Sequence, residues 1–262
     1  MIIDGKALAR DSSIALKANI KKCSGLTLGI FMIAPTEETK SFVRIKKRKA
    51  DELGASIVEE ELSFETSTEE AANSLRELIK KVDGVVIQQP LPEHIDTEAL
   101  NALLPKEKDV DALTKESPYM SPVAGAVAEI FSAYNVNPKG MKAVVIGSGA
   151  LVGRPVAKFL EEQGAQVIVM TKETGIDLEV MKKADIVVSG AGKPGLITKN
   201  MLQQSAIVID AGTSESNGAM VGDVDPECYE HVYLISPVPG GVGPLTVVSL
   251  FKNLYKSASC SS

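Results

Sequence analysis

Short apolar runs alternate with longer segments of helical period along most of the chain, and this alternation constrains the fold more than any other feature. In the first half, strands are expected at residues 26–33, 55–60 and 84–88. Helices are expected near residues 6–22, 38–53 (ended by Gly54) and 67–81 (opened by Ser67 and Glu70 as a capping box). Strands that alternate with helices are typical of βα units around a mostly parallel sheet, so the sequence predicts an α/β protein.

A second set of elements follows residue 120. A helix is expected near residues 123–134, and strands at 142–146, 166–170, 186–189, 206–209 and 232–235. A proline- and glycine-rich segment, 236–244, precedes a final amphipathic helix. The 262 residues suffice for two domains. We expect residues 1–120 plus 246–262 to form the first α/β domain and residues 121–245 a second, Rossmann-like domain, with a cleft between them.

Composition argues against several classes of protein. The formal net charge of −6 is unfavourable for a nucleic-acid partner, because phosphate binding depends on clustered Lys and Arg. No apolar run approaches the ~20 residues that span a membrane, and the first residues lack the signal-peptide pattern. We therefore expect a cytoplasmic protein with no membrane contact. Cys23, Cys228 and Cys260 are widely spaced, so neither a disulfide framework nor a metal site is expected.

A glycine-rich turn follows the expected strand 142–146. Gly147, Gly149 and Gly153 lead into a helix whose N-terminal N–H groups could meet a pyrophosphate. Gly153 comes four residues after Gly149 instead of three, so a plain strand-to-helix turn is an open alternative. After the next strand, Thr171 and Lys172 stand where an NAD site usually has an acid. A hydroxyl and a cation there suit a 2′-phosphate and favour NADP over NAD, unless Lys172 is only a solvated loop lysine.

The first half carries a candidate site for a flat heterocycle. Phe42 and Lys46 are four residues apart on an expected helix and share a face, although Lys46–Lys49 is also compatible with an ordinary basic helix surface. Gln88 directly follows a strand, at the sheet edge where open α/β proteins bind ligands. The run KDVD at 108–111 offers carboxylates that could accept hydrogen bonds from the N–H donors of a pterin.

Several motifs occur in an order that resembles the bifunctional methylenetetrahydrofolate dehydrogenase/methenyltetrahydrofolate cyclohydrolase family. They are DGK at 4–6, DGVVIQQPLP at 83–92, KDVD at 108–111, the glycine turn at 145–155, GAGKP at 190–194 and SPVPGGVGPLTV at 236–247. The resemblance runs from about residue 2 to residue 256. It implies an oxidoreductase and hydrolase of one-carbon metabolism, which oxidises 5,10-methylenetetrahydrofolate with NADP (NAD remaining possible) and hydrolyses the methenyl product to 10-formyltetrahydrofolate.

The resemblance also implies a homodimer with folate in the cleft, and it assigns roles to residues. The implied catalytic residues are Lys46, Gln88 and Asp111. The implied substrate-binding residues are Phe42, Pro90, Leu91, Pro239, Gly240 and Gly241. The implied cofactor-binding residues are Gly147, Ser148, Gly149, Val152, Gly153, Arg154, Thr171, Lys172, Gly190, Gly192 and Thr213.

The chain departs from the family pattern at several positions. Phe42 replaces the usual tyrosine, Ala112 replaces a glycine, and residues 121–125, 211 and 213–214 also differ. Because Phe42 lacks the hydroxyl, a dehydrogenase without cyclohydrolase activity is one alternative. A catalytically silent folate-binding relative is another, although it would be expected to lose Lys46 or Asp111. A two-domain dehydrogenase acting on a small acid would share the fold but would not explain Gln88 or the 236–246 motif.

Overall fold

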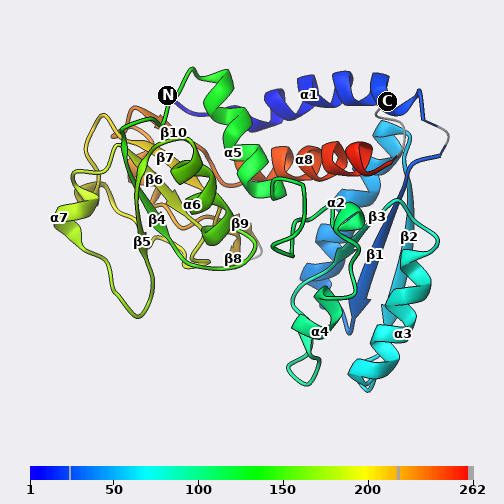
Figure 1. The fold of residues 1–262 in the computed structure, drawn as a ribbon. Coiled ribbons are helices and arrows are strands. Elements are labelled where there is room, and N and C mark those ends of the chain that lie inside the picture. Colours follow the sequence, from blue (N-terminus) through cyan, green and yellow to red (C-terminus); the bar gives the residue numbers. More distant parts are fainter. Residues whose placement is uncertain (24, 217–218, 259–262) are drawn as a thin grey trace. The chain divides into compact units, whose positions relative to one another are not determined.

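The structure of the protein, a computed structural model, describes residues 1–23, 25–216 and 219–258, so Cys260 lies outside the described residues. The chain divides into two compact units, each described by itself below. The β1–β3 unit comprises Asp11–Pro122 and Val247–Ser262. The β4–β10 unit comprises Met1–Arg10 and Val123–Thr246. Figure 1 labels the elements of both.

The β1–β3 unit is built on a parallel sheet in the order β2-β1-β3. Its strands are β1 (Thr27–Ile33), β2 (Ser56–Leu62) and β3 (Gly84–Ile87). Its helical segments are α2 (Glu37–Leu53), α3 (Thr68–Ile79), the short α4 (Thr97–Asn101) and the 3-10 turn η1 (Lys106–Lys108). Because the strands are parallel, the chain leaves β1 and β3 at the same edge of the sheet. β1 lies between β2 and β3, so the strand order reverses at β1. Open α/β sheets bind ligands at such an edge.

The β4–β10 unit contains a parallel sheet in the order β10-β7-β6-β4-β5. Its strands are β4 (Lys142–Ile146), β5 (Gln166–Met170), β6 (Ile186–Ser189), β7 (Ile207–Asp210) and β10 (Leu234–Ile235). Its helices are α5 (Pro122–Ala133), α6 (Gly153–Glu162) and α7 (Leu178–Met181), with 3-10 turns η2 (Lys199–Met201) and η3 (Pro226–Cys228). A separate antiparallel pair joins β8 (Ser214–Ser216) and β9 (Ala219–Val221). In sequential numbering the parallel sheet has the 2-1-3-4-5 order of doubly wound nucleotide-binding folds.

Three helices contain the points at which the chain passes between the units. These are α1 (Gly5–Ile20), the first turn of α5 and α8 (Val242–Ser257). The expected fold class, two α/β domains of which the second is Rossmann-like, is confirmed. Within the described residues, no helix combines the length and the apolar composition needed to cross a bilayer.

The helix ends follow the local chemistry of the sequence. Ser67 accepts from the Glu70 N–H while the Glu70 carboxylate accepts from the Ser67 N–H, which is the expected capping box at the start of α3. Gly54 ends α2 at φ 82°, a left-handed conformation that costs glycine little. Both signals are confirmed because they involve residues only a few positions apart.

The structure corrects two expectations. The strand expected at 232–235 is shorter, because the Val232 N–H donates to Cys228 O at 3.2 Å and so belongs to the turn after η3. Residues 1–10, expected in the first domain, pack in the β4–β10 unit. There the Ile3 N–H donates to Ile235 O at 2.8 Å, which extends the edge of the sheet at β10. Short terminal segments carry little periodicity, and only this long-range pairing reveals where they belong.

Candidate active site

Lys46 and Gln88 meet at the carboxyl edge of the β1–β3 sheet. The Gln88 N–H donates to Phe31 O at 2.9 Å, so its backbone is still held by β1. Lys46 comes from α2, and its Nζ donates to Gln88 Oε1 at 2.6 Å. Gln88 Nε2 donates in turn to Gln89 O at 3.1 Å, which fixes which end of the amide faces the lysine. Residues 42 positions apart are thereby joined into one polar group.

Asp111 completes this group through its charge. Burial lowers the pKa of Lys46, and the nearby Asp111 charge partly opposes that effect. Burial raises the pKa of Asp111, whereas Lys46 lowers it and Asp109 raises it. A lysine with a lowered pKa can both accept and donate a proton nearer to neutral pH. Lys46, Gln88 and Asp111, expected as one site, are brought together by the fold.

The run KDVD contains two residues that hold the loop, Lys108 and Asp109, and one half-buried carboxylate, Asp111. Lys108 Nζ donates to Ile79 O and Val82 O, each at 2.7 Å, and so caps the end of α3. Asp109 is fully buried, and its carboxylate accepts from the Leu113 N–H at 3.0 Å and from the Thr114 N–H at 2.8 Å. These bonds hold the loop that presents Asp111. Of the two carboxylates in the run, Asp111 is therefore the one suited to meet a ligand.

Ala112, where the family has glycine, adopts a left-handed conformation with φ 54°. The turn is closed by its N–H, which donates to Asp109 O at 3.1 Å. A side chain in this conformation costs roughly 1–2 kcal/mol. The family's glycine therefore matches a backbone requirement of the loop, and this chain meets that requirement under strain.

Replacing Ala112 with Gly is expected to stabilise the protein. Relieving the strain stabilises the folded state by more than the extra conformational entropy of glycine stabilises the unfolded chain. The free energy of unfolding should therefore rise by about 0.5–1 kcal/mol, which raises Tm by about 1–4 °C. Thermal unfolding of the variant tests this. Ala102→Gly is the matched control, because Ala102 has φ −63° and the same substitution there should destabilise the protein. Equal effects at both positions would contradict the strain argument.

The expected substrate contacts in the β1–β3 unit surround the same edge. Phe42 is half-buried on α2, one turn before Lys46. Pro90 is exposed after a cis peptide bond with Gln89. Leu91 packs against the hydrophobic core formed by α3, β1 and β3, so part of its role is structural. Phe42 and Pro90 thus remain as candidate ligand contacts, each close in the sequence to a member of the lysine group.

The glycine turn of the β4–β10 unit has the close packing that a phosphate loop needs. A Cβ on Gly153 would lie 2.0 Å from Gly147 O, and Gly147 itself has φ 101°. A Cβ on Gly149 would meet nothing within 4 Å, so that glycine is not required by packing. Val152 provides no side-chain cap for α6. The Arg154 N–H donates to Gly149 O at 3.1 Å and Pro155 has no N–H, so a phosphate would be met by the glycine turn and the positive end of the helix dipole. The residues present fit a dinucleotide.

The two candidate cations, Arg154 and Lys172, are each connected to the glycine turn. Arg154 Nε donates to Ser148 O at 3.2 Å, which lays the guanidinium against the turn. The Gly147 N–H donates to Met170 O at 2.8 Å, and the exposed Lys172 follows two residues later. Thr171 accepts from the Thr174 N–H at 3.4 Å, so its hydroxyl helps to shape the Lys172 turn.

The remaining expected ligand residues of this unit lie in loops that follow β6, β7 and β10. Gly190 contacts the glycine turn, since its Cβ would lie 2.3 Å from Val152 Cγ1. Gly192 has φ 64°, and Thr213 is exposed after β7. Pro239–Gly241 follow β10, and a Cβ on Gly241 would lie 2.6 Å from Pro237 O. Because β6, β7 and β10 are parallel, all of these residues lie in loops at the same edge of the sheet.

The buried polar residues beneath these loops have no functional role that the sequence motifs predict. Ser189, Asp210, Asp223 and Ser236 are each at most 1 % exposed. Asp223 carries no spacing or motif signal of its own, and its role depends on contacts with residues 30 to 34 positions away. Among the described residues, no group of three His, Cys, Asp or Glu side chains could hold a metal ion.

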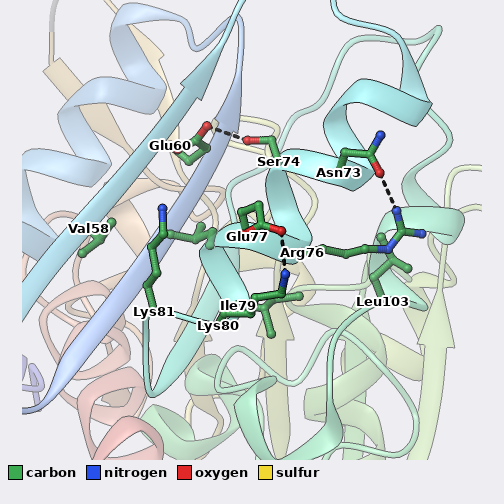
Figure 2. Close-up of a pocket in the computed structure, with 11 residues that line it drawn as sticks. Val58, Glu60, Asn73, Ser74, Arg76, Glu77, Ile79, Lys80, Lys81 and Leu103 are labelled. Carbon is green, nitrogen blue, oxygen red and sulfur yellow. Dashed lines mark hydrogen bonds and ion pairs between the residues drawn. The ribbon is translucent and has the colours of Figure 1, made fainter.

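A surface pocket of about 740 Å³ lies elsewhere, between β2 and α3 (Figure 2). Six of its polar side chains bond to one another in three pairs. Ser74 donates to Glu60 at 2.5 Å, Arg76 donates to Asn73 at 2.9 Å and Lys80 donates to Glu77 at 2.6 Å. Because these groups satisfy one another, the pocket lacks the convergent chemistry of the Lys46 group.

Family models match both parts of the chain, the one with the Lys46 group and the one with the glycine turn. Residues 3–111 match the tetrahydrofolate dehydrogenase/cyclohydrolase catalytic domain, and residues 121–262 match the NAD(P)-binding domain of the same family. The bifunctional protein FolD of Methanospirillum hungatei is 37% identical, over 97% of this chain and 95% of its own.

Solved structures agree as well. The bifunctional FolD of Campylobacter jejuni has a TM-score of 0.93 at 29% identity, with 98% of each chain covered. The Trypanosoma brucei enzyme, complexed with NADP cofactor and inhibitor, has a TM-score of 0.90 at 29% identity, covering 98% of this chain and 96% of its own. Two family models that together match most of the chain, and a relative this similar over nearly its full length, decide the assignment. The chain belongs to the tetrahydrofolate dehydrogenase/cyclohydrolase family.

Proposed function

We propose that this protein oxidises 5,10-methylenetetrahydrofolate with NADP and then hydrolyses the methenyl product to 10-formyltetrahydrofolate. The observation that carries the proposal is the Lys46–Gln88 hydrogen bond of 2.6 Å beside Asp111, a proton-transfer group at the ligand edge of a parallel sheet. The family membership of both domains supports it. Bound NADP would supply the hydride acceptor, held by the glycine turn and the loops after β6 and β7.

The β1–β3 unit would orient the folate and move protons. Asp111 would accept hydrogen bonds from the pterin, while Phe42 would lie against its ring. Loss of hydride from the methylene carbon leaves a methenyl cation, to which water adds. The neutral Lys46 amine would take a proton from that water and return one to the nitrogen whose C–N bond breaks. Gln88 would keep the amine aimed at this proton path.

An assay with two absorbance readouts tests the proposal. One readout follows nicotinamide reduction with methylenetetrahydrofolate, and the other follows loss of the methenyl compound supplied directly. We expect both activities. Nicotinamide reduction without methenyl loss would favour a dehydrogenase whose second activity was lost with the tyrosine at position 42. The intact Lys46–Gln88 bond argues against that alternative.

Lys172 is expected to set the preference for NADP over NAD. Lys172→Asp would replace a cation near the 2′-phosphate by a carboxylate that repels it and accepts from ribose hydroxyls. The ratio of kcat/KM for NADP over NAD should fall by roughly 10- to 100-fold, the value of one charge-assisted hydrogen bond. Initial rates with each nucleotide measure this ratio.

Lys158→Asp is the control for this charge reversal. Lys158 is exposed on α6, where it pairs with Glu162, so its replacement should leave the ratio unchanged. A wild-type enzyme that already prefers NAD would contradict the role of Lys172. Arg154 is the second cation to test, because it lies against the turn itself.

We also infer that two copies of the chain associate through the edge of the β4–β10 sheet. β5 is the last strand in the order β10-β7-β6-β4-β5, and it exposes Ile168 and Val169 to 48% and 38%. An unpaired edge strand with exposed apolar side chains is a surface that proteins normally cover.

Ile168→Lys is expected to weaken this dimer by at least about tenfold in Kd, because a charge would be buried in the contact. Analytical ultracentrifugation over a range of concentrations measures the change. Leu178→Lys is the control, because Leu178 is equally exposed at 48% but lies on α7. Equal weakening by both variants, or a wild-type monomer, would contradict the β5 interface.

A further inference from the structure

We infer that Asp223 is a positioning residue of the nucleotide site, whose buried carboxylate holds the loop after β6 in its binding conformation. The inference rests on the proposed function, since it requires that this loop contact the dinucleotide. Asp223 lies two residues after β9 and is fully buried.

One carboxylate organises the whole loop. Asp223 Oδ2 accepts from Ser189 Oγ at 2.7 Å, from the Ala191 N–H at 2.8 Å and from the Gly192 N–H at 3.2 Å. Asp223 Oδ1 accepts from the Lys193 N–H at 2.6 Å. Successive backbone N–H groups that converge in this way form an anion-binding concavity. In this protein the chain's own carboxylate fills that concavity.

This arrangement assigns different tasks to two glycine-containing loops. The N–H groups of residues 191–193 are engaged by Asp223, so this loop is shaped by an internal anion. The turn from Gly147 to Gly153 leads into α6, whose N-terminus is capped by no side-chain carboxylate, so this turn is the one suited to a phosphate. Gly190 packs directly on Val152, which precedes α6, so a displaced loop would also disturb the phosphate turn.

Asp210 couples the same carboxylate to the loops after β7 and β10. It accepts from the Asp223 N–H at 3.1 Å, from the Gly212 N–H at 3.0 Å and from the Val224 N–H at 2.9 Å. The Asp210 N–H donates to Ser236 Oγ at 2.7 Å, at the start of the 236–244 segment. The loops that carry Gly190, Thr213 and Gly240 are therefore anchored to one buried network.

Glycines leave room for this network. A Cβ on Gly212 would lie 2.3 Å from the Asp223 carboxyl carbon, and a Cβ on Gly222 would lie 2.1 Å from Asp210 Oδ2. Burial, opposed by hydrogen bonds and reinforced by the Asp223 charge, raises the pKa of Asp210 to about 6. Two neighbouring buried carboxylates repel each other, and the backbone N–H groups that they order compensate for this.

Asp223→Asn tests the inference. The amide keeps the size of the side chain but places an NH₂ donor against the N–H and O–H donors that bond the carboxylate. The loop after β6 should therefore lose part of its anchor. The Kd for NADPH should rise by about tenfold or more, the loss of one charge-assisted hydrogen bond or more. NADPH fluorescence measures the Kd directly, and the chain has no tryptophan to interfere. Methenyl hydrolysis uses no nucleotide, and the Asp223 carboxylate bonds the loop after β6, so the hydrolysis rate should change much less than the Kd.

Two further variants make the test specific. Asp225→Asn is the matched control, because Asp225 lies two residues away but caps η3 through the Glu227 N–H at 2.8 Å. Its Kd for NADPH should equal that of the wild type. Ser189→Ala removes the hydroxyl donor and leaves the three backbone N–H donors, so a smaller rise of about threefold is expected. It decides the question if Asp223→Asn does not fold.

The outcomes separate the inference from the proposed function. A Kd that stays unchanged in Asp223→Asn, with only a lower Tm, would reduce Asp223 to a structural residue and overturn the inference. An unchanged Kd in Ser189→Ala would do the same if Asp223→Asn fails to fold. If the wild-type protein does not bind NADPH while it hydrolyses the methenyl compound, the proposed cofactor is wrong, and the inference fails with it.

Discussion

Lys46→Met is expected to lower methenyl hydrolysis by about 10²- to 10⁴-fold, the usual contribution of general acid–base catalysis. Methionine keeps most of the length of the side chain but removes the amine that bonds Gln88 at 2.6 Å. Affinity for NADPH should be unchanged, because the glycine turn belongs to the other unit. Stopped-flow absorbance of the methenyl compound measures the hydrolysis rate, and NADPH fluorescence measures the affinity.

Lys47→Met is the control on the same helix. The Lys47 amine pairs with Glu59 on β2, and its removal should leave both activities unchanged. Wild-type hydrolysis by Lys46→Met would exclude the lysine from the mechanism. Equal loss in both lysine variants would point to a general effect on α2 instead.

The pH dependence of hydrolysis follows from the pKa of Lys46. Burial lowers that pKa, so a larger share of the amine is neutral near pH 7 than for an exposed lysine. The proposed base is the neutral amine, so the rate should fall as pH decreases through the pKa of Lys46. The Asp111 charge raises the pKa of Lys46, so it sets the pH at which this acid limb of the rate profile falls.

Asp111→Asn is expected to have the second largest effect. Loss of the charge-assisted hydrogen bonds to the pterin should raise the folate KM by roughly 10- to 100-fold, or about 1.5–3 kcal/mol. The substitution also removes the charge that raises the pKa of Lys46, so the acid limb of hydrolysis should move to lower pH. Steady-state kinetics over a series of pH values measure both effects.

Asp109→Asn provides the contrast two residues away. The Asp109 carboxylate holds its own loop through the Leu113 and Thr114 N–H groups, so this variant should chiefly lower Tm. An unchanged folate KM and an unmoved acid limb in Asp111→Asn would refute the assignment of Asp111. A change in KM without any shift of the limb would separate pterin binding from the coupling to Lys46.

Much of the fold could be predicted from the sequence because its signals are local. The strand bounds 142–146, 166–170 and 186–189 agree with β4, β5 and β6. Buried parallel strands appear as short apolar runs, and the capping box at Ser67 and the glycine at position 54 act over a few residues. The family motifs also predict Lys46, Gln88 and Asp111 as site residues, although the sequence shows no contact between them.

Only the tertiary structure decided what those residues do to one another. Asp109 and Asp111 have the same side chain, and only their surroundings distinguish a carboxylate that holds a loop from one whose charge acts on the pKa of a lysine. Asp223 acts on residues 30 to 34 positions away, which no local pattern reveals. Periodicity and capping depend on neighbours in the sequence, whereas burial, charge coupling and loop anchoring depend on segments that become neighbours only when the chain folds.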